Sequence, residues 1–364
     1  MTPPVEIAEA IEELLHSAVD RLSEPGRGAT RRIVAAGGKR LRPELLVRCA
    51  GLGGGTGPGG LSADPVHRAA TLGAAAAVEL LHSATLLHDD LLDDSETRRG
   101  VPAVHRAEGL PTAVIGGDAL IAQSWRSIAR ADPDDVEDLA EALADMCTGQ
   151  ELEAGLAFDP AARPLDVLRV AQLKTGALLR AACRIGGRRA GLSEVQVRAL
   201  GSYGSDLGIA LQLVDDVLDV ASEPTLLGKP CGADFVAGTM TMPTVYAIAD
   251  SPSAARLIAL LRAGLDPADA ERARLLVWSS GGAQRTADLA RSFARRAGKS
   301  MNGVVAAGGV GSEHAALAAL PMAYVQSQLQ TKIAAPDADL LAPQVRPDDI
   351  ALLAGLDGYG SVAG

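Results

Sequence analysis

Residues Leu86–Gly100 read LLHDDLLDDSETRRG, and more of the fold and function depends on this stretch than on any other. It continues an apolar helical pattern that begins at Val66, and it places Asp89 and Asp93 one turn apart on the same helix face. Like charges at this spacing cost helix stability, which a divalent cation would offset. Oxygen ligands suit Mg²⁺, which usually keeps waters and substrate phosphates as its other ligands. The stretch therefore predicts a helix that ends in a metal site, and a solvated acidic helix end is the simpler alternative.

A second acidic turn repeats the same spacing. Leu211–Val220 reads LQLVDDVLDV and sets Asp215, Asp216 and Asp219 in another apolar helix, more than one hundred residues further on. Two such turns predict facing helices whose carboxylates hold metal ions on a polyanion, and diphosphate is the obvious candidate. Arg98 and Arg99 follow the first turn, and guanidinium groups match phosphate oxygens.

The rest of the chain also has the sequence pattern of successive helices. Ala and Leu recur at helical spacing and alternating β patterns are scarce, so we predict an all-α protein. We find no repeat at solenoid period and no domain linker, which predicts one α domain over residues 1–333 and a loose C-terminal tail over 334–364. The helices we expect span residues 6–22, 41–50, 66–92, 112–129, 136–157, 165–185, 193–220, 243–249, 254–261, 267–279, 283–297 and 313–333.

Composition excludes several classes of protein. The 364 residues are 48% hydrophobic, which is ample for a buried core, but they include only three Phe, two Trp and four Tyr. Few aromatic rings and a net charge of −11 argue against a nucleic-acid partner. Four separated cysteines without a CxxC pair indicate reduced thiols, and we see no signal peptide and no uncharged apolar run of membrane-spanning length. We therefore expect a cytoplasmic protein without a transmembrane segment.

The two acidic turns and their surroundings resemble the trans-isoprenyl diphosphate synthases of the polyprenyl synthetase family. The matching segments, in family order, are GGKRLRP from Gly37, VELLHSATLLHDD from Val78, IGGDALIA from Ile115, GQELE from Gly149, KTGAL from Lys174, LGIALQLVDDVLD from Leu207 and GKPCGADF from Gly228. The resemblance implies a multi-helix bundle around a central active-site cavity, of the isoprenoid synthase type, and a homodimer. It implies head-to-tail condensation of isopentenyl diphosphate with an allylic diphosphate, with Mg²⁺ as cofactor, three ions per active site.

The resemblance also implies roles for individual residues. We expect Asp89, Asp93 and Asp215 to bind Mg²⁺ directly, and Asp90, Asp216 and Asp219 to bind it or to support those that do. The allylic diphosphate and the carbocation are expected to contact Lys174, Thr175, Gln212, Lys229 and Arg98, and the isopentenyl diphosphate Lys39, Arg42, His82 and Arg99. Of all these, Asp89, Asp93, Asp215, Lys174 and Gln212 are expected to be the catalytic set. An isolated Lys or Arg more often faces solvent, and an isolated His on an apolar helix is more often part of the core.

Two positions and one predicted helix depart from the family pattern. Gly238–Pro243 reads GTMTMP, so Thr239 stands where the family usually has a lysine that contacts the allylic diphosphate. Leu211 replaces the phenylalanine usually found before Gln212. The last predicted helix, YVQSQLQTK from Tyr324, lacks the basic cluster common in short-chain members. These departures bear on substrate affinity and leave the metal residues in place.

Product length in this family depends on the residues four, five and eight positions before the first aspartate, which line the elongation tunnel. Here they are Thr85, Ala84 and Leu81, and no aromatic residue lies between Pro43 and Val114. Ala84 leaves room beneath the growing chain, so we predict a product of geranylgeranyl length or longer. The alternative is that Ala84 only allows close helix packing.

Other functions fit the sequence less well. A terpene cyclase on the same scaffold could dispense with Lys39, Arg42, His82 and Arg99, all of which are present. A non-catalytic subunit of a heteromeric prenyl synthase would have little reason to keep both DDxxD motifs. His88 beside Asp89 could suggest an HD phosphohydrolase, but six histidines without the further ligands argue against it, and we expect His88 to point off the aspartate face.

Overall fold

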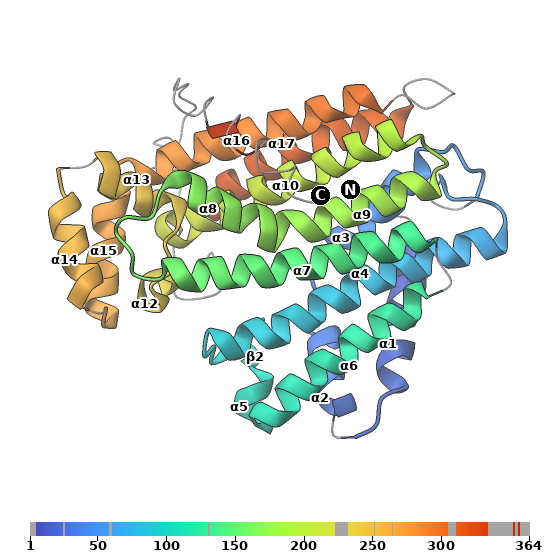
Figure 1. Ribbon diagram of the computed structural model, residues 1–364, viewed down its shortest axis with the longest axis horizontal. Helices are drawn as coiled ribbons and strands as arrows, with labels where there is room; N and C mark the ends of the chain where they lie inside the picture. Colours follow the sequence, from blue (N-terminus) through green and yellow to red (C-terminus); the bar gives the residue numbers. More distant parts are fainter. Residues whose placement is uncertain are drawn as a thin grey trace. The chain divides into compact units, whose positions relative to one another are not determined.

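A computed structural model of the chain describes residues 5–24, 26–57, 60–129, 132–222, 232–250, 252–263, 265–304, 311–333, 352–353 and 356. The described chain is helical almost throughout, so the all-α prediction is confirmed (Figure 1). Its longer helices are α1 (Val5–Asp20), α2 (Gly26–Ala35), α3 (Leu41–Gly51), α4 (Pro65–Leu92), α6 (Leu110–Ile128), α7 (Pro133–Leu156), α8 (Pro164–Ala171), α9 (Ala177–Arg189), α10 (Glu194–Ala221), α13 (Met242–Asp250), α14 (Ala254–Ala263), α15 (Pro267–Ser279), α16 (Gly282–Ser300) and α17 (Ser312–Lys332).

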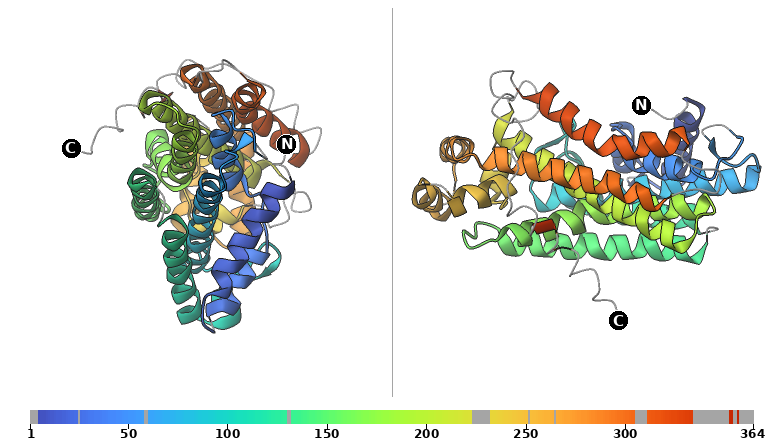
Figure 2. Two further views of the ribbon diagram at one scale, coloured as in Figure 1. Left: turned by 90° about the vertical axis from the view of Figure 1, so that its right-hand side faces the viewer. Right: turned by 90° about the horizontal axis from the view of Figure 1, so that it is seen from above.

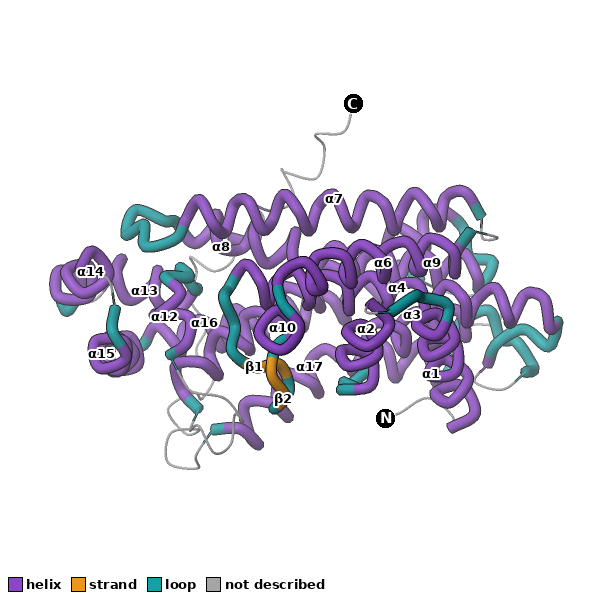
Figure 3. Tube along the Cα trace, turned by 90° about the horizontal axis from the view of Figure 1, so that it is seen from below, coloured by secondary structure: helices purple, strands orange, loops and turns teal. Residues whose placement is uncertain are grey.

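Shorter elements join these helices. They are the strands β1 (Thr97–Arg98) and β2 (Val101–Pro102), the helices α5 (Val104–Glu108) and α12 (Ala233–Ala237), the π-helical turn η2 (Gln172–Gly176) and the 3₁₀ turn η3 (Met301–Gly303). The two strands pair antiparallel as a hairpin (Figure 3), the one sheet within the described ranges. The hairpin, η2, α2, α5 and α12 were not predicted from the sequence.

The chain forms two compact units, each built from separate segments. The first contains residues 1–143, 178–204 and 300–317, and the second contains residues 144–177, 205–299 and 318–364. The first acidic turn lies in the first unit and the second acidic turn in the second unit.

Helix α4 is the core helix of the first unit. Asp64 caps its start by accepting hydrogen bonds from the amides of Val66 and His67, at 3.2 and 3.3 Å. Residues 74–81 are all buried, and α6 packs along the helix. Gly117 of α6 allows this approach, because a Cβ there would lie 2.1 Å from Nε2 of His88. The ring of His88 therefore faces α6, where Nε2 lies 3.3 Å from the carbonyl oxygen of Val114, in agreement with the prediction that it points off the aspartate face.

By length and composition, α4 alone among the described helices could cross a membrane. However, 67% of its most apolar window is buried inside the protein, as in the core helix of a soluble fold.

Buried ion pairs hold α7 to α9 in the first unit. Asp135 near the start of α7 is fully buried and accepts from Nε of Arg188 at 2.8 Å and from Nη2 of Arg189. One turn further, Asp138 is paired with Arg188 and with Arg184. A carboxylate buried this deeply requires such partners, because an unpaired charge in the interior is costly.

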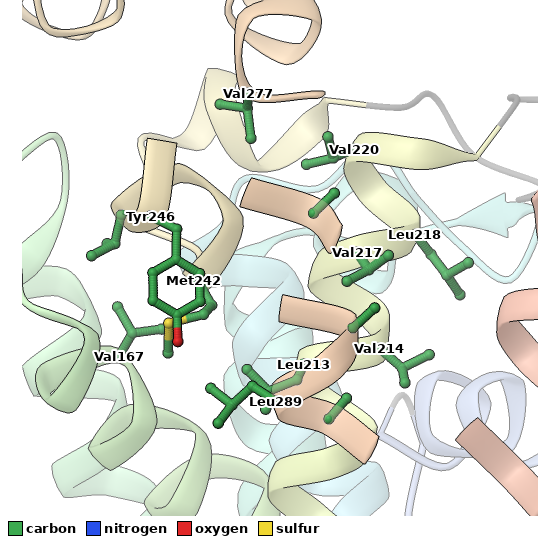
Figure 4. Packing of buried hydrophobic residues seen from close by; sticks show 14 of the residues in the cluster. Val167, Leu213, Val214, Val217, Leu218, Val220, Met242, Tyr246, Val277 and Leu289 are labelled. Carbon is green, nitrogen blue, oxygen red and sulfur yellow. The ribbon is translucent and has the colours of Figure 1, made fainter. Parts of the chain in front are cut away.

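The second unit has its own aliphatic core (Figure 4). Leu213, Val214, Val217 and Leu218 of α10 belong to one buried cluster with Met242 and Tyr246 of α13, and α8, α15 and α16 add Val167, Val277 and Leu289. Alanines of α16 and leucines of α14 complete the cluster, and Figures 1 and 2 show α13, α14 and α15 side by side. Leu, Val and Ala thus supply most of this core, as the small number of aromatic residues indicates.

Three residues of the C-terminal segment belong to this cluster. Leu356 is 1% exposed, and Leu352 and Leu353 are partly buried against the same core. Arg296 of α16 donates to the carbonyl oxygen of Leu353 at 2.6 Å while its other nitrogens pair with Asp206. The rest of the predicted tail, residues 334–351, 354–355 and 357–364, lies outside the described residues.

Candidate active site

The first acidic turn forms the end of α4. Asp93 is the C-cap of the helix, and its amide donates to the carbonyl oxygen of Asp89 at 2.9 Å. The following residue, Asp94, has φ 50°, a left-handed conformation that stops the helix. Asp89 is half-buried and Asp93 is exposed, whereas Asp90 is 1% exposed. The turn therefore presents two carboxylates, one turn apart, on its more accessible side.

Asp90 points the other way and anchors the hairpin. Its Oδ1 accepts from Nε of Arg98 at 2.7 Å and also from Nη2. Arg98 is in β1, and the turn to β2 uses Arg99 and Gly100, with φ 52° and 80°. Two successive positive φ angles are typical of tight hairpin turns. The Asp90–Arg98 pair thus fixes the hairpin that presents Arg99.

Positive charge gathers around His82 on α4. Burial is the main cause that lowers the pKa of His82 well below its usual value, and the nearby charges of Arg42, Arg99, Arg98 and Arg40 lower it further. The pKa of Arg99 is also lowered, chiefly by burial. Gly38 lies against this guanidinium, because a Cβ there would be 2.8 Å from Nη2 of Arg99. We call Arg42, Arg98 and Arg99, which lie around His82, the cationic cluster. Lys39 is exposed, two residues before α3 begins at Leu41.

Arg40, which lies between the predicted site residues Lys39 and Arg42, has a structural role. Its guanidinium pairs with Glu12 at 2.7 Å and with the buried Glu79 at 2.8 Å, and it donates to the carbonyl oxygen of Val34. Its own φ is 46°, at the start of α3. Arg40 is therefore neutralised by carboxylates. Cations collected in one place, as in the cationic cluster, favour an anionic ligand.

The three residues predicted to control product length lie on α4, about one to two turns before Asp89. Leu81 and Ala84 are fully buried and Thr85 is half-buried. The hydroxyl of Thr85 donates to the carbonyl oxygen of His82 at 2.9 Å, so its methyl group is the part left to contact other groups.

In the second unit, η2 carries Lys174 and Thr175. A π-helical turn inserts one residue into a helix, often at functional sites, and changes the direction of the side chains that it carries. Gly208 of α10 lies directly against η2, since a Cβ there would be 2.5 Å from Cα of Gly176. This close approach allows the hydroxyl of Thr175 to donate to Oε1 of Gln212 at 2.9 Å, so the structure brings these two predicted residues together.

Lys174 has a partner that sequence reasoning did not assign. Its Nζ donates to Oε2 of Glu153 on α7. Both side chains are about one-quarter exposed. Gly149 makes room for the lysine stem, because a Cβ there would lie 2.8 Å from Cγ of Lys174. Glu153 belongs to the GQELE segment quoted above, and that segment was the only signal that could have identified it.

The second acidic turn has one exposed and two buried carboxylates. Asp215 is exposed, and Asp216 and Asp219 are 4% and 1% exposed. Oδ1 of Asp216 accepts from Nε2 of Gln212 at 3.0 Å, and Oδ2 accepts from the amide of Met242 at 3.2 Å. Burial raises the pKa of Asp216 to about 7, although these two hydrogen bonds act to lower it. Lys229 lies outside the described residues.

These carboxylates fit Mg²⁺ by donor type. Asp89 and Asp93 are in one unit and Asp215 and Asp219 in the other, and all four offer the hard oxygen ligands that Mg²⁺ prefers. Within the described residues, no group of three or more His, Cys, Asp or Glu forms a metal site by itself. Mg²⁺ commonly binds through one or two carboxylates together with substrate phosphates.

Comparisons with known proteins identify the family. Residues 26–276 match the polyprenyl synthetase family. The chain is 35% identical to the nonaprenyl diphosphate synthase of Mycobacterium tuberculosis over 289 residues, 79% of this chain and 83% of that protein. It is 36% identical to the geranylgeranyl diphosphate synthase of the same organism over 298 residues, 76% and 82% of the two chains.

Solved structures agree. The polyprenyl synthase of Caulobacter crescentus, crystallised with calcium and isoprenyl diphosphate, has a TM-score of 0.78 and 32% identity over 89% of this chain and 98% of that chain. The decaprenyl diphosphate synthase of Rhodobacter capsulatus has a TM-score of 0.77 and 32% identity over 88% and 96%. The chain therefore belongs to the polyprenyl synthetase family and is a trans-prenyltransferase with the all-α isoprenoid synthase fold. Its activity is trans-prenyl chain elongation.

Proposed function

We propose that the protein condenses isopentenyl diphosphate with an allylic diphosphate, head to tail and with Mg²⁺, to give an all-trans polyprenyl diphosphate of geranylgeranyl length or longer. The observation that carries this proposal is the cationic cluster beside the first acidic turn. A group of cations around His82 suits a second diphosphate, which an enzyme that only ionises one substrate would not need.

In the proposed reaction the allylic C–O bond breaks and diphosphate leaves. The alkene of the isopentenyl unit attacks the allylic cation, a C–C bond forms, and a proton is lost from the isopentenyl unit. When bound, Mg²⁺ would neutralise the leaving diphosphate, and Asp89, Asp93, Asp215 and Asp219 would hold the metal. Three ions per active site are the family expectation, and we propose the same number here.

The side chains of this protein supply the remaining contacts. Lys174 and Thr175 on η2 would bind the allylic diphosphate, together with Arg98 and Lys229, and the carbonyl oxygen of Gln212 would face the allylic cation. The pairing with Glu153 holds Lys174 in position for the anion. Lys39, Arg42, His82 and Arg99 would bind isopentenyl diphosphate. A fixed set of cations stabilises the leaving group more strongly as its charge develops.

For product length, we propose that Leu81, Ala84 and Thr85 line the elongation tunnel. The side chains at 81 and 84 are aliphatic and small enough to leave space for further C₅ units, each of which would bury more apolar surface. We further propose that the active form is a cytoplasmic homodimer, as in the family resemblance. Size-exclusion chromatography with light scattering tests the dimer, and a monomeric, fully active enzyme would exclude it.

The decisive assay uses purified protein, isotopically labelled isopentenyl diphosphate, Mg²⁺ and each allylic diphosphate from C₅ to C₂₀, with products separated by chain length. We expect elongated diphosphates that disappear when EDTA is added. Hydrocarbon products would indicate a cyclase, and no turnover would indicate a non-catalytic subunit.

A matched pair of variants tests the metal residues. We expect Asp89→Asn to reduce turnover at least about 100-fold, because it removes charge from the metal site. Asp94→Asn changes a nearby exposed aspartate whose carboxylate pairs with Arg106 at 2.8 Å, and we expect it to keep most of the activity. Equal losses in both variants would refute the specific role of Asp89.

A further inference from the structure

The two adjacent aspartates of the second acidic turn have different environments. Asp215 is exposed, whereas Asp216 is 4% exposed and each of its carboxylate oxygens already accepts a hydrogen bond from the protein. A Mg²⁺ ligand needs an oxygen that can turn toward the metal and its waters. Asp216 is therefore placed as an acceptor for protein groups.

One of the two donors to Asp216 is the side-chain amide of Gln212. An amide has two chemically opposite ends, and its orientation depends on the groups that they meet. Nε2 of Gln212 lies 3.0 Å from Oδ1 of Asp216, and Oε1 lies 2.9 Å from the hydroxyl of Thr175. Both oxygens of Asp216 accept hydrogen bonds here, so its side chain selects the NH₂ end of Gln212 and leaves the carbonyl oxygen on the Thr175 side.

The other donor is a main-chain amide on a well-supported turn. Met242 begins α13, and the turn before it is held by the amide of Phe158, which donates to the carbonyl oxygen of Gly238 at 2.8 Å. Thr241 in the same turn donates its amide to the carbonyl oxygen of Thr239 at 3.0 Å. The amide of Met242 is thus fixed relative to α10, and it holds Oδ2 of Asp216 in place.

We infer that Asp216 is a positioning residue for Gln212, and that it acts by keeping the carbonyl oxygen of Gln212 directed toward the allylic carbon where positive charge develops. This inference rests on the proposed function, because it assigns Gln212 the role of stabilising the cation. Thr175, Gln212, Asp216 and the amide of Met242 form one hydrogen-bonded chain, so the orientation at one end depends on the acceptor at the other.

The first test is Asp216→Asn, which keeps size and shape. The carboxamide oxygen of Asn must accept from Met242, so its NH₂ group meets Gln212 and selects the carbonyl end of that amide. Gln212 then turns its NH₂ group toward Thr175 and the substrate. We expect kcat to fall about 10-fold or more, the order expected for one misdirected hydrogen-bonding group. KM for the allylic diphosphate and the Mg²⁺ concentration for half-maximal rate should stay within about twofold of the wild type.

A compensating pair provides the second test. In Gln212→Glu alone, two carboxylates face each other, so we expect a loss of activity. In Gln212→Glu/Asp216→Asn, Asn donates to one oxygen of Glu and Thr175 donates to the other, which restores an oxygen on the substrate side. We expect the double variant to have a higher kcat than either single variant. A double variant as poor as the product of the two losses would overturn the inference.

Thr244→Val is the matched control for lost stability. Its hydroxyl lies 3.1 Å from that of Thr241, buried beside the same turn, and it makes no hydrogen bond to Asp216. We expect this variant to lower the melting temperature and to keep kcat. All rates are referred to the folded fraction measured by circular dichroism.

Besides an uncompensated double variant, three results would overturn the inference: wild-type kcat in Asp216→Asn, an increased Mg²⁺ requirement that matches Asp215→Asn, or an equal loss of kcat in Thr244→Val. Failure of the wild-type protein to elongate any allylic diphosphate would instead refute the proposed function.

Discussion

The contact between Gly208 and Gly176 provides a direct test of how η2 is positioned. In the second unit these two glycines bring α10 and η2 into backbone contact, and Gln212 is one turn along α10 from Gly208. Gly208→Ala adds a single methyl group at this contact. The methyl carbon would lie 2.5 Å from Cα of Gly176 and 2.8 Å from its amide nitrogen. Both neighbours are backbone atoms, so neither can move aside by a change of rotamer.

The size of the effect follows from these distances. Ordinary contact begins at 3.4 Å, so α10 and η2 must separate by about 1 Å. The hydrogen bond from Thr175 to Gln212, now 2.9 Å, would lengthen to about 4 Å and be lost. Overpacking of this kind costs about 1–3 kcal/mol of stability. A displacement of about 1 Å in a positioning element can reduce the rate about 100-fold.

The assay compares steady-state elongation rates and urea unfolding for Gly208→Ala and for Gly155→Ala. Gly155 lies near the end of α7 in the same unit, and a Cβ there would meet nothing within 4 Å. The control variant should gain up to about 1 kcal/mol of stability and keep its activity, because alanine favours helix more than glycine does. A Gly208→Ala enzyme with wild-type kcat would show that the close approach of α10 to η2 does not set the reaction geometry.

Three further predictions concern product length, pH and stability. Ala84→Val and Ala84→Phe should shorten the product progressively, as measured by chromatography of the dephosphorylated prenols, and an unchanged distribution in both would exclude Ala84 from the tunnel. Because the pKa of His82 is lowered in the folded state, the protein takes up a proton when it unfolds below pH 6.5. The free energy of unfolding is therefore unaffected by this group above pH 6.5. It should fall as the pH decreases below that value, by at most about 1.4 kcal/mol per pH unit. Urea unfolding at pH 7.5 and 5.5 should therefore show a smaller difference in His82→Gln than in the wild type, and an equal difference would contradict the lowered pKa. Asp135→Asn should lose about 3–5 kcal/mol, because it removes the buried carboxylate that pairs with Arg189, whereas Asp269→Asn breaks an exposed pair and should lose no more than about 1 kcal/mol. Similar losses in the two variants would show that burial of the pair is unimportant.

The sequence by itself determined the helical class and most of the long helices. Periodicity at 3.6 residues per turn is a local property of a chain rich in Ala and Leu, and it located α4, α10 and the acidic turns at their ends. It missed α2, which begins Gly-Arg-Gly and has little helix propensity, so tertiary packing stabilises it. It also read α8, η2 and α9 as one continuous helix, because the insertion of a single π-helical residue leaves no mark on apolar spacing.

The sequence also predicted which residues form the site, because the family motifs keep their order along the chain. The direction in which each side chain points could not be read from the sequence. Asp89 and Asp90, or Asp215 and Asp216, are equivalent letters in a DDxxD motif, and only the fold turns Asp90 to Arg98 and Asp216 to Gln212 and Met242. The pairing of Lys174 with Glu153 likewise joins two residues that are 21 positions apart, a separation at which helical spacing does not predict a contact. Spacing along a helix determines which residues share a face. The partner that each face contacts depends on long-range packing, which the sequence pattern does not show. Long-range packing therefore decided which carboxylates are accessible and which are held by hydrogen bonds within the protein.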